Sequence, residues 1–115
     1  MPVQNENTVL DMDQLRNISM EDTELMRELV AALIEDATTH ISKLQAAVED
    51  ADAEQSQRLA HYVKGACANV GAASMAAILR NIEVKAKSGD FSGCRSSLIG
   101  LSEELTKFSS EAAAL

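Results

Sequence analysis

The feature that most constrains the fold is a set of apolar stripes that repeat every three or four residues. The longest stripe comprises Leu25, Leu29, Leu33, Ala37, Ile41, Leu44 and Val48. Similar stripes follow within residues 59–70, 75–86 and 94–112. Apolar residues at this spacing share one face of an α-helix. Four amphipathic helices would have to bury these faces against one another, which predicts an all-α fold.

The composition also favours helices and one compact unit. Aromatic residues make up only 3% of the chain, and its only proline is Pro2. A chain of 115 residues fits one domain with one core. No apolar run is long enough to span a membrane, and the polar start lacks the features of a signal peptide. We therefore expect a cytoplasmic protein without a membrane segment.

Capping signals predict where each helix begins and ends. A flexible lead, residues 1–10, should precede a single domain, residues 11–115. The first helix is expected over 11–18, followed by one that Ser19 caps and that runs to about Glu49. A capping box at Asp52 and Gln55 should begin the next helix, and Gly71 should end it. A further helix is expected near residues 72–87, and Ser88-Gly89-Asp90 should separate it from the last helix. Such short connections predict an up-and-down antiparallel four-helix bundle with a short additional N-terminal helix.

Charge is distributed unevenly along the chain. The net charge of −8 argues against nucleic acid as a partner. Residues 58–87 nevertheless carry five cations against one acid, Glu83. The cations of this basic window are Arg58, Lys64, Arg80, Lys85 and Lys87. An anionic group bound near this window would find a favourable local charge.

His61 lies within that window, on the side of its helix opposite the apolar residues. It points about 180° away from their stripe, so we expect an exposed imidazole. The stripe comprises Leu59, Val63, Ala66 and Val70. Lys64 and Gly65 follow one turn later, and Ala68 extends the low surface. A glycine inside a helix costs roughly 1 kcal/mol relative to alanine, which suggests that a large partner must approach closely. A neutral imidazole beside a cation is suited to accept a phosphoryl group from such a partner.

Other chemistries find little support in the sequence. Cys67 and Cys94 fall at helix-packing positions and are expected to be small buried residues, not a disulfide. His40, the other histidine, falls on a different helix, and neither a Glu-x-x-His pair nor a Cys-x-x-Cys motif suggests a metal site. The sequence contains no recognisable hydrolase motif and no glycine-rich phosphate loop. Neither hydrolysis nor ATP binding is therefore expected.

The segment Leu59 to Ala72, LAHYVKGACANVGA, resembles the signature of the histidine-containing phosphotransfer (HPt) domains of bacterial multistep phosphorelays. The resemblance extends through Leu79, Ile82 and Glu83 and covers about residues 12–112. It implies a phosphocarrier that lacks its own kinase or ATP-binding domain and is therefore not an enzyme. It also implies response-regulator receiver domains and a hybrid sensor histidine kinase as partners of a monomer.

The same resemblance implies roles for individual residues. His61 would carry the phosphoryl group on Nε2, and Lys64 would interact with that group. Gly65 would leave room for the receiver. Independently of the resemblance, Ala68, which has a small side chain, and Arg58, which belongs to the basic window, are expected to contribute to the docking surface. No cofactor would belong to the chain itself, because the receiver supplies Mg²⁺.

A polar residue at the position of Glu83 contacts the histidine from the neighbouring helix in some family members. Arg80 accompanies Glu83 as a possible supporting residue. An ion pair within the helix, between Glu83 and Arg80 or Lys87, is an alternative role. Ala66 and Cys67 stand where the family frequently has serines, so a hydroxyl contact to the imidazole is not expected in this chain.

Three alternative functions come from other classes. A histidine-kinase dimerisation domain would have an acid directly after the histidine and a proline soon after it, whereas Tyr62 follows His61 and no proline comes after it. A non-catalytic helical adaptor that binds a signalling partner would not accept phosphate on His61. A metal-binding bundle would contain metal when purified.

Overall fold

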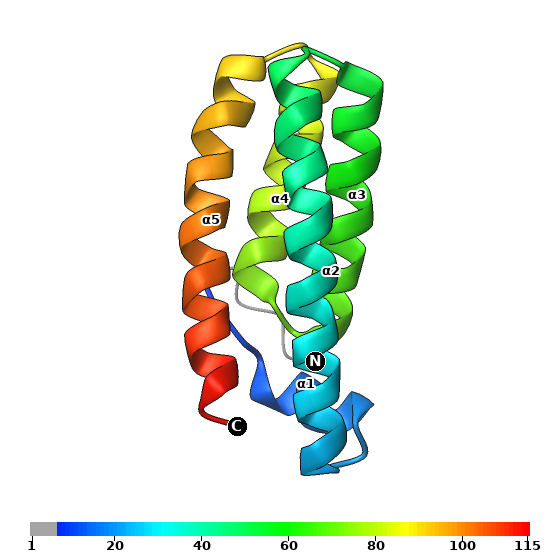
Figure 1. The fold of residues 1–115 in the computed structure, drawn as a ribbon, viewed down its shortest axis with the longest axis vertical. Helices are drawn as coiled ribbons and strands as arrows, with labels where there is room; N and C mark the ends of the chain where they lie inside the picture. The colour runs from blue at the N-terminus through cyan, green and yellow to red at the C-terminus, as the bar shows by residue number, and fades with distance from the viewer. Residues whose placement is uncertain (1–6) are drawn as a thin grey trace.

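The computed structural model describes residues 7–115 and contains five α-helices (Figure 1). They are α1 (Met12–Ile18), α2 (Thr23–Glu49), α3 (Ala53–Val70), α4 (Ala73–Lys87) and α5 (Phe91–Ala113). More than two-thirds of the chain is helical, and no strand occurs within residues 7–115. The predicted all-α class is therefore confirmed. None of the described helices is both long and apolar enough to cross a bilayer.

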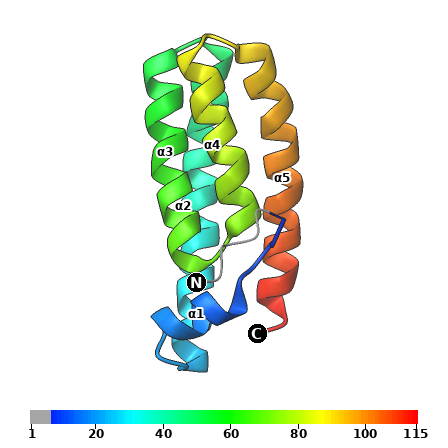
Figure 2. The same ribbon diagram turned by 180° about the vertical axis from the view of Figure 1, so that it is seen from behind.

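The four longer helices lie side by side and alternate in direction (Figures 1 and 2). Each packs against the next in chain order, and α5 returns to pack against α2. One apolar core runs between them, with fully buried side chains from every helix of the bundle. These include Leu44, Val63, Leu79, Ile82, Leu101 and Phe108. The outward face of α3, flanked by α2 and α4, is thereby held in place by the core behind it.

The ends of α3 follow the capping signals of the sequence. The Asp52 side chain accepts a hydrogen bond from the Gln55 amide at 3.1 Å, which satisfies one free donor of the first turn. Gly71 ends the helix with a φ of 94°, a left-handed conformation that suits glycine. The Gly71 carbonyl also accepts from the Asp11 amide at 2.8 Å, and a Cβ at Gly71 would lie 2.9 Å from the Asp11 oxygen. Gly71 thus both ends α3 and admits the N-terminal segment.

The start of α2 differs from the sequence prediction. Asp22, not Ser19, caps the helix, and its side chain accepts from the amides of Glu24 and Leu25. Ser19 instead ends α1, where its buried hydroxyl donates to the Leu15 carbonyl at 2.7 Å. Both residues have side chains suited to capping, but the Ser19 hydroxyl is bonded to the last turn of α1 and does not reach α2.

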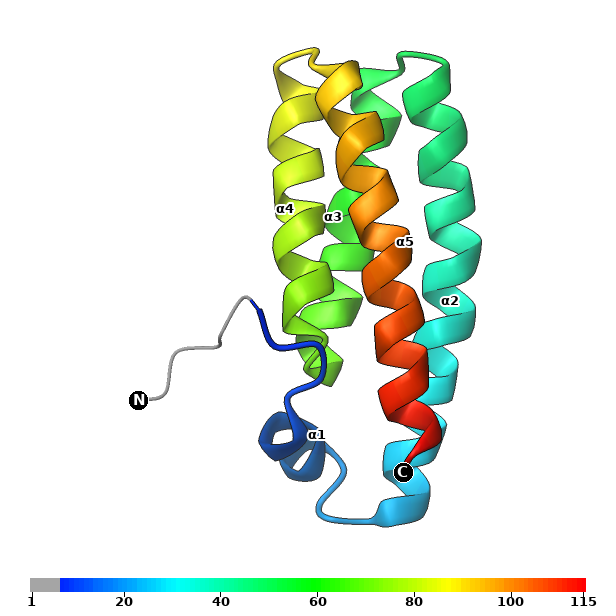
Figure 3. The same cartoon turned by 90° about the vertical axis from the view of Figure 1, so that its left-hand side faces the viewer.

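The N-terminal segment is attached to the bundle before residue 11. Leu10 is buried in the core, and the Thr8 carbonyl accepts from the Ser74 amide at 2.8 Å. This contact serves the start of α4, whose cap residue Ala72 has no capping side chain. The expected flexible lead therefore does not extend to residue 10, and residues 1–6 lie outside the described residues. Figure 3 shows α1 lying across the end of the bundle beside the α3–α4 connection.

The buried face of α3 is rotated relative to the predicted stripe. Ala60 and Cys67 are fully buried, whereas Leu59 and Ala66 are only partly buried. The face shifts by roughly half of the 100° step between successive residues. The shift arises because α3 packs against both α2 and α4. Cys67 and Cys94 are both buried and unpaired, as predicted.

Candidate functional site

His61 projects from the outward face of α3. Its side chain is 67% exposed, in agreement with the prediction from helical position. Its neighbours Ala60 and Val63 are in the core and hold this turn of the helix against the bundle. The imidazole is therefore accessible to a macromolecule while its backbone is firmly positioned.

The imidazole contacts a carboxylate from the next helix. Nδ1 of His61 lies 3.2 Å from Oε2 and 3.4 Å from Oε1 of Glu83 on α4. A carboxylate only accepts hydrogen bonds, so Nδ1 of a neutral ring must carry the proton in this arrangement. The lone pair of the neutral imidazole is then on Nε2. Glu83 thus selects the tautomer in which Nε2, the outer ring nitrogen, carries the free lone pair.

Lys64 contacts the same carboxylate from one turn along α3. Its Nζ lies 2.9 Å from Oε1 of Glu83, and both side chains are mostly buried. Partial burial raises the pKa of the Glu83 carboxyl, but the hydrogen bond and charge of Lys64, followed by those of His61, lower it below its usual value. Glu83 is therefore an anion held between a cation and an imidazole.

These contacts show that Glu83 reaches the neighbouring helix, the first of the two roles considered for it. Its carboxylate reaches across to His61 and Lys64 on α3. The resemblance described above implied a contact of this kind from the position of Glu83 to the histidine. The contact between Lys64 and a phosphoryl group stays a prediction, because the ammonium group of Lys64 is engaged with Glu83 in this structure. Arg80 is exposed on α4, one turn before Glu83.

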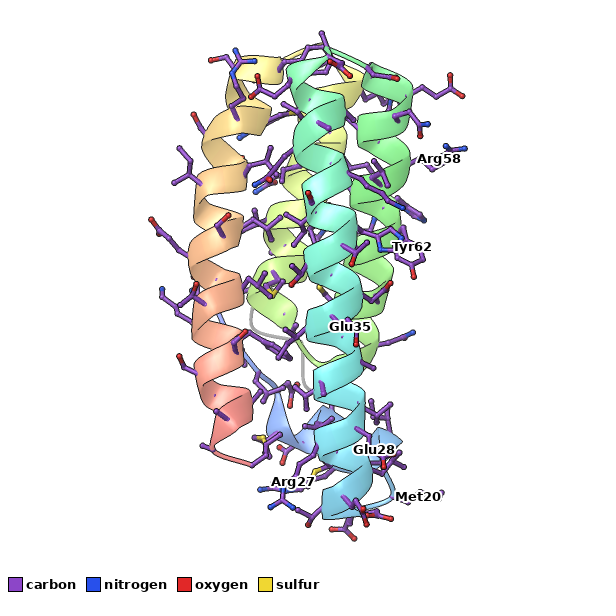
Figure 4. The ribbon with its side chains drawn as sticks, viewed as in Figure 1. Met20, Arg27, Glu28, Glu35, Arg58 and Tyr62 are labelled. Carbon is purple, nitrogen blue, oxygen red and sulfur yellow. The ribbon has the colours of Figure 1, made fainter. Side chains whose placement is uncertain are left out.

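The remaining predicted site residues lie along the same side of α3. Gly65 is exposed, and a Cβ built on it would meet no atom within 4 Å. Packing within the chain therefore does not explain this glycine. Arg58 is exposed one turn before His61, and Tyr62 projects near it (Figure 4). Ala68 is half-buried, and its carbonyl accepts a hydrogen bond from the Gln14 side chain, so it lies at the α1 end of the surface.

A second polar cluster was not anticipated from the sequence. The Tyr62 hydroxyl donates to Oδ2 of Asp36 at 2.8 Å, and the Tyr62 ring packs against His40. His40 and Asp36 lie one turn apart on α2 and also contact each other. Residues four apart on a helix are neighbours, so the contact between Asp36 and His40 could have been predicted from the sequence. The contact of Asp36 with Tyr62 joins residues 26 apart on different helices, so no local sequence pattern predicted it.

Comparison with known proteins adds the decisive observation. The chain matches the family model of the Hpt domain over residues 28–111, which includes His61, Lys64 and Glu83. The chain belongs to the Hpt domain family. The resemblance found in the sequence is thereby confirmed. Like other Hpt domains, it is a phosphocarrier of two-component phosphorelays and not a kinase, and it acts with receiver domains and kinases.

The fold of this Hpt domain is also found in a solved structure. The crystal structure of histidine-containing phosphotransfer protein B (HptB) from Pseudomonas aeruginosa PAO1 superimposes with a TM-score of 0.83. The two chains are 21% identical, and the match covers 95% of this chain and 98% of HptB. None of the curated proteins compared with the chain matches it. Within residues 7–115, no group of three or more His, Cys, Asp or Glu side chains is placed to hold a metal ion.

Proposed function

We propose that His61 accepts a phosphoryl group on Nε2 from the aspartyl phosphate of one receiver domain and passes it to the aspartate of another. The contact between Nδ1 of His61 and the Glu83 carboxylate carries this proposal. It leaves the exposed nitrogen as the nucleophile and keeps the inner nitrogen as a donor. The up-and-down antiparallel bundle supports α3 from behind and leaves the His61 imidazole uncovered.

The transfer itself needs little beyond positioning and charge. The Nε2 lone pair attacks phosphorus while the bond between phosphorus and the aspartyl oxygen breaks, and the carboxylate leaves with that electron pair. Nδ1 keeps its proton, so the phosphorylated ring carries a positive charge. The Glu83 carboxylate then forms an ion pair with that ring. Return of the phosphoryl group to a carboxylate reverses each of these changes, so the same contact serves both directions.

Lys64 has two roles in this scheme. Its ammonium group holds the Glu83 carboxylate beside Nδ1 and favours its ionised form. It also contributes a positive charge one turn from Nε2, where the phosphoryl oxygens develop their charge. Both effects favour a phosphorylated His61.

The surface around His61 suits a close macromolecular partner. Gly65 presents no side chain beside His61, and Arg58 and Ala68 extend the surface in the two directions along α3. Arg58 and Lys64 complement the acidic pocket of a receiver, which brings its own Mg²⁺. Such complementarity mainly increases the rate of encounter. A monomeric carrier in the cytoplasm fits this use.

The proposal is tested with a purified receiver domain that carries an aspartyl phosphate. We expect transfer to the parent protein of a label that is acid-labile and stable to alkali, mapped by mass spectrometry to His61. His61→Gln should abolish the label with a change in unfolding free energy of only about 0.5 kcal/mol, because the side chain is exposed. Labelling that persists in His61→Gln would refute the assignment and direct attention to His40. A parent that binds receivers and never becomes labelled would instead be an adaptor.

A further inference from the structure

Tyr62 is an exposed aromatic residue whose position is nevertheless restrained. It follows His61 directly, and 48% of it is exposed. Its hydroxyl donates to Oδ2 of Asp36 at 2.8 Å. Its ring lies on the ring of His40, with centroids 4.3 Å apart and planes tilted by 31°. An exposed tyrosine without such contacts would sample several rotamers.

The two residues that restrain Tyr62 also restrain each other. Nδ1 of His40 lies 2.9 Å from the Asp36 carbonyl oxygen and 3.1 Å from Oδ1 of its side chain. Both atoms only accept, so Nδ1 of a neutral His40 carries the proton. The hydrogen bond from Tyr62 to Asp36, together with partial burial and the charge of Asp36, raises the pKa of the Tyr62 phenol. A phenol is protonated near neutral pH in any case, and this shift extends its role as a donor to higher pH.

His61 and Tyr62 lie on opposite halves of the outward face of α3. His61 leans toward Glu83 on α4, whereas Tyr62 leans toward Asp36 on α2. Gly65 lies about one turn after both residues, and no side chain projects from this face at its position. A receiver domain that lies flat on this face, with its aspartate at Nε2 of His61, would also contact Tyr62.

We propose that Tyr62 is the docking anchor that sets the affinity of this Hpt domain for receiver domains, and that Asp36 and His40 are positioning residues that hold its ring ready. The inference rests on the proposed function of His61. A large ring with fixed orientation offers contact area to a partner with little loss of side-chain entropy on binding. Tyrosine is accordingly enriched among the residues that dominate interface energies. The occupant is the receiver, because its aspartate must reach the neighbouring residue.

Two phosphoryl donors separate docking from chemistry. Phosphoramidate, which transfers its phosphoryl group to an imidazole with loss of ammonia, is too small to use a docking surface. A phosphorylated receiver domain, chosen as the one that labels the parent protein fastest, must dock. Both rates are measured for each variant, and the receiver-dependent rate is divided by the phosphoramidate rate.

Tyr62→Ala should raise the receiver concentration for half-maximal transfer by about tenfold, the size expected for loss of an interface anchor. Ile99→Ala is the matched control, because Ile99 is a 66% exposed apolar residue on α5. It should leave the receiver dependence at the parental value. If Tyr62→Ala fails to fold, Tyr62→Leu carries the same expectation.

The positioning residues are tested by rescue. His40→Ala should weaken docking about threefold, and His40→Phe should restore it, because phenylalanine retains the ring contact. Asp36→Ala should weaken docking, and Asp36→Asn should restore most of it, because the amide oxygen still accepts from the phenol. A residue that merely stabilised the bundle would change thermal stability without this pattern of rescue.

The possible failures are distinguishable. If Tyr62→Ala and Tyr62→Leu keep the parental receiver dependence, the anchor is refuted while the role of His61 stands. If the alanine and rescue variants of His40 and Asp36 all match the parent, the positioning roles are refuted. If neither donor labels His61 in the parent protein, the proposed function fails and the inference fails with it.

Discussion

Nδ1 of His61 and the carboxylate of Glu83 lie 3.2 Å apart across the α3–α4 interface. The contact joins a mostly exposed imidazole to a mostly buried anion that Lys64 also holds. One carboxylate thus sets both the tautomer of the ring and the position of the Lys64 ammonium group.

Replacing Glu83 should separate its hydrogen-bonding role from its charge. Glu83→Ala removes the acceptor for Nδ1 and the counter-ion of the phosphorylated ring, and should slow transfer from a saturating receiver by about tenfold. Glu83→Gln retains an acceptor without the charge. Its transfer rate should lie between those of Glu83→Ala and the parent. Glu103→Gln, at an exposed position of α5, is the control. Single-turnover kinetics would measure these rates, and a parental rate in Glu83→Ala would contradict the role.

The lowered pKa of Glu83 predicts how its contribution to stability depends on pH. The folded state favours the ionised carboxyl, so the contribution is fully present above the unfolded pKa of about 4.3 and is lost as pH falls through the lower folded pKa. The difference in unfolding free energy between the parent and Glu83→Gln should be at most about 1 kcal/mol near pH 7 and should shrink toward pH 3. Denaturant titrations at several pH values would measure it. A difference that grows toward acid would have the wrong sign.

Gly65 and Gly100 form a matched pair for testing access. Both lie inside helices, and a Cβ on either would meet no atom within 4 Å. Replacing either glycine by glutamine should leave stability unchanged or raise it by up to about 1 kcal/mol, because helix propensity improves. Gly65→Gln should also weaken receiver docking and slow transfer in both directions, whereas Gly100→Gln should not. Thermal unfolding combined with transfer kinetics over a range of receiver concentrations would decide. Parental transfer by Gly65→Gln would show that close approach does not explain this glycine.

Lys64 should act through charge with little effect on docking. Lys64→Ala removes the cation beside Glu83, which we propose also acts on the phosphoryl oxygens. It should slow transfer severalfold and shift the equilibrium away from phosphorylated His61. Receiver affinity should change by less than about threefold, because the Lys64 side chain is mostly buried. The equilibrium distribution of label between receiver and His61 measures the shift. An unchanged distribution with lost affinity would make Lys64 a docking residue instead.

Local sequence patterns determined the helices and the side of α3 that faces outward. The spacing of apolar residues predicted α2 to α5, and Asp52 and Gly71 predicted the ends of α3. The exposure of His61 followed from its angle to the apolar stripe, even though that stripe is rotated in the structure. These features were predictable because helical hydrogen bonds and caps join residues at most a few positions apart.

Contacts between helices were decided only by the tertiary structure. Glu83 lies 19 residues after Lys64 and 22 after His61, and Tyr62 lies 26 after Asp36. The sequence placed Glu83 on a neighbouring helix and left open whether it would pair within that helix or across to α3. Local spacing specifies which face of a helix a residue occupies, but not which residue of the adjoining helix comes opposite it. That register depends on how the side chains of the whole core pack together, which is why Glu83 reaches His61 and Asp36 reaches Tyr62 only in the folded bundle.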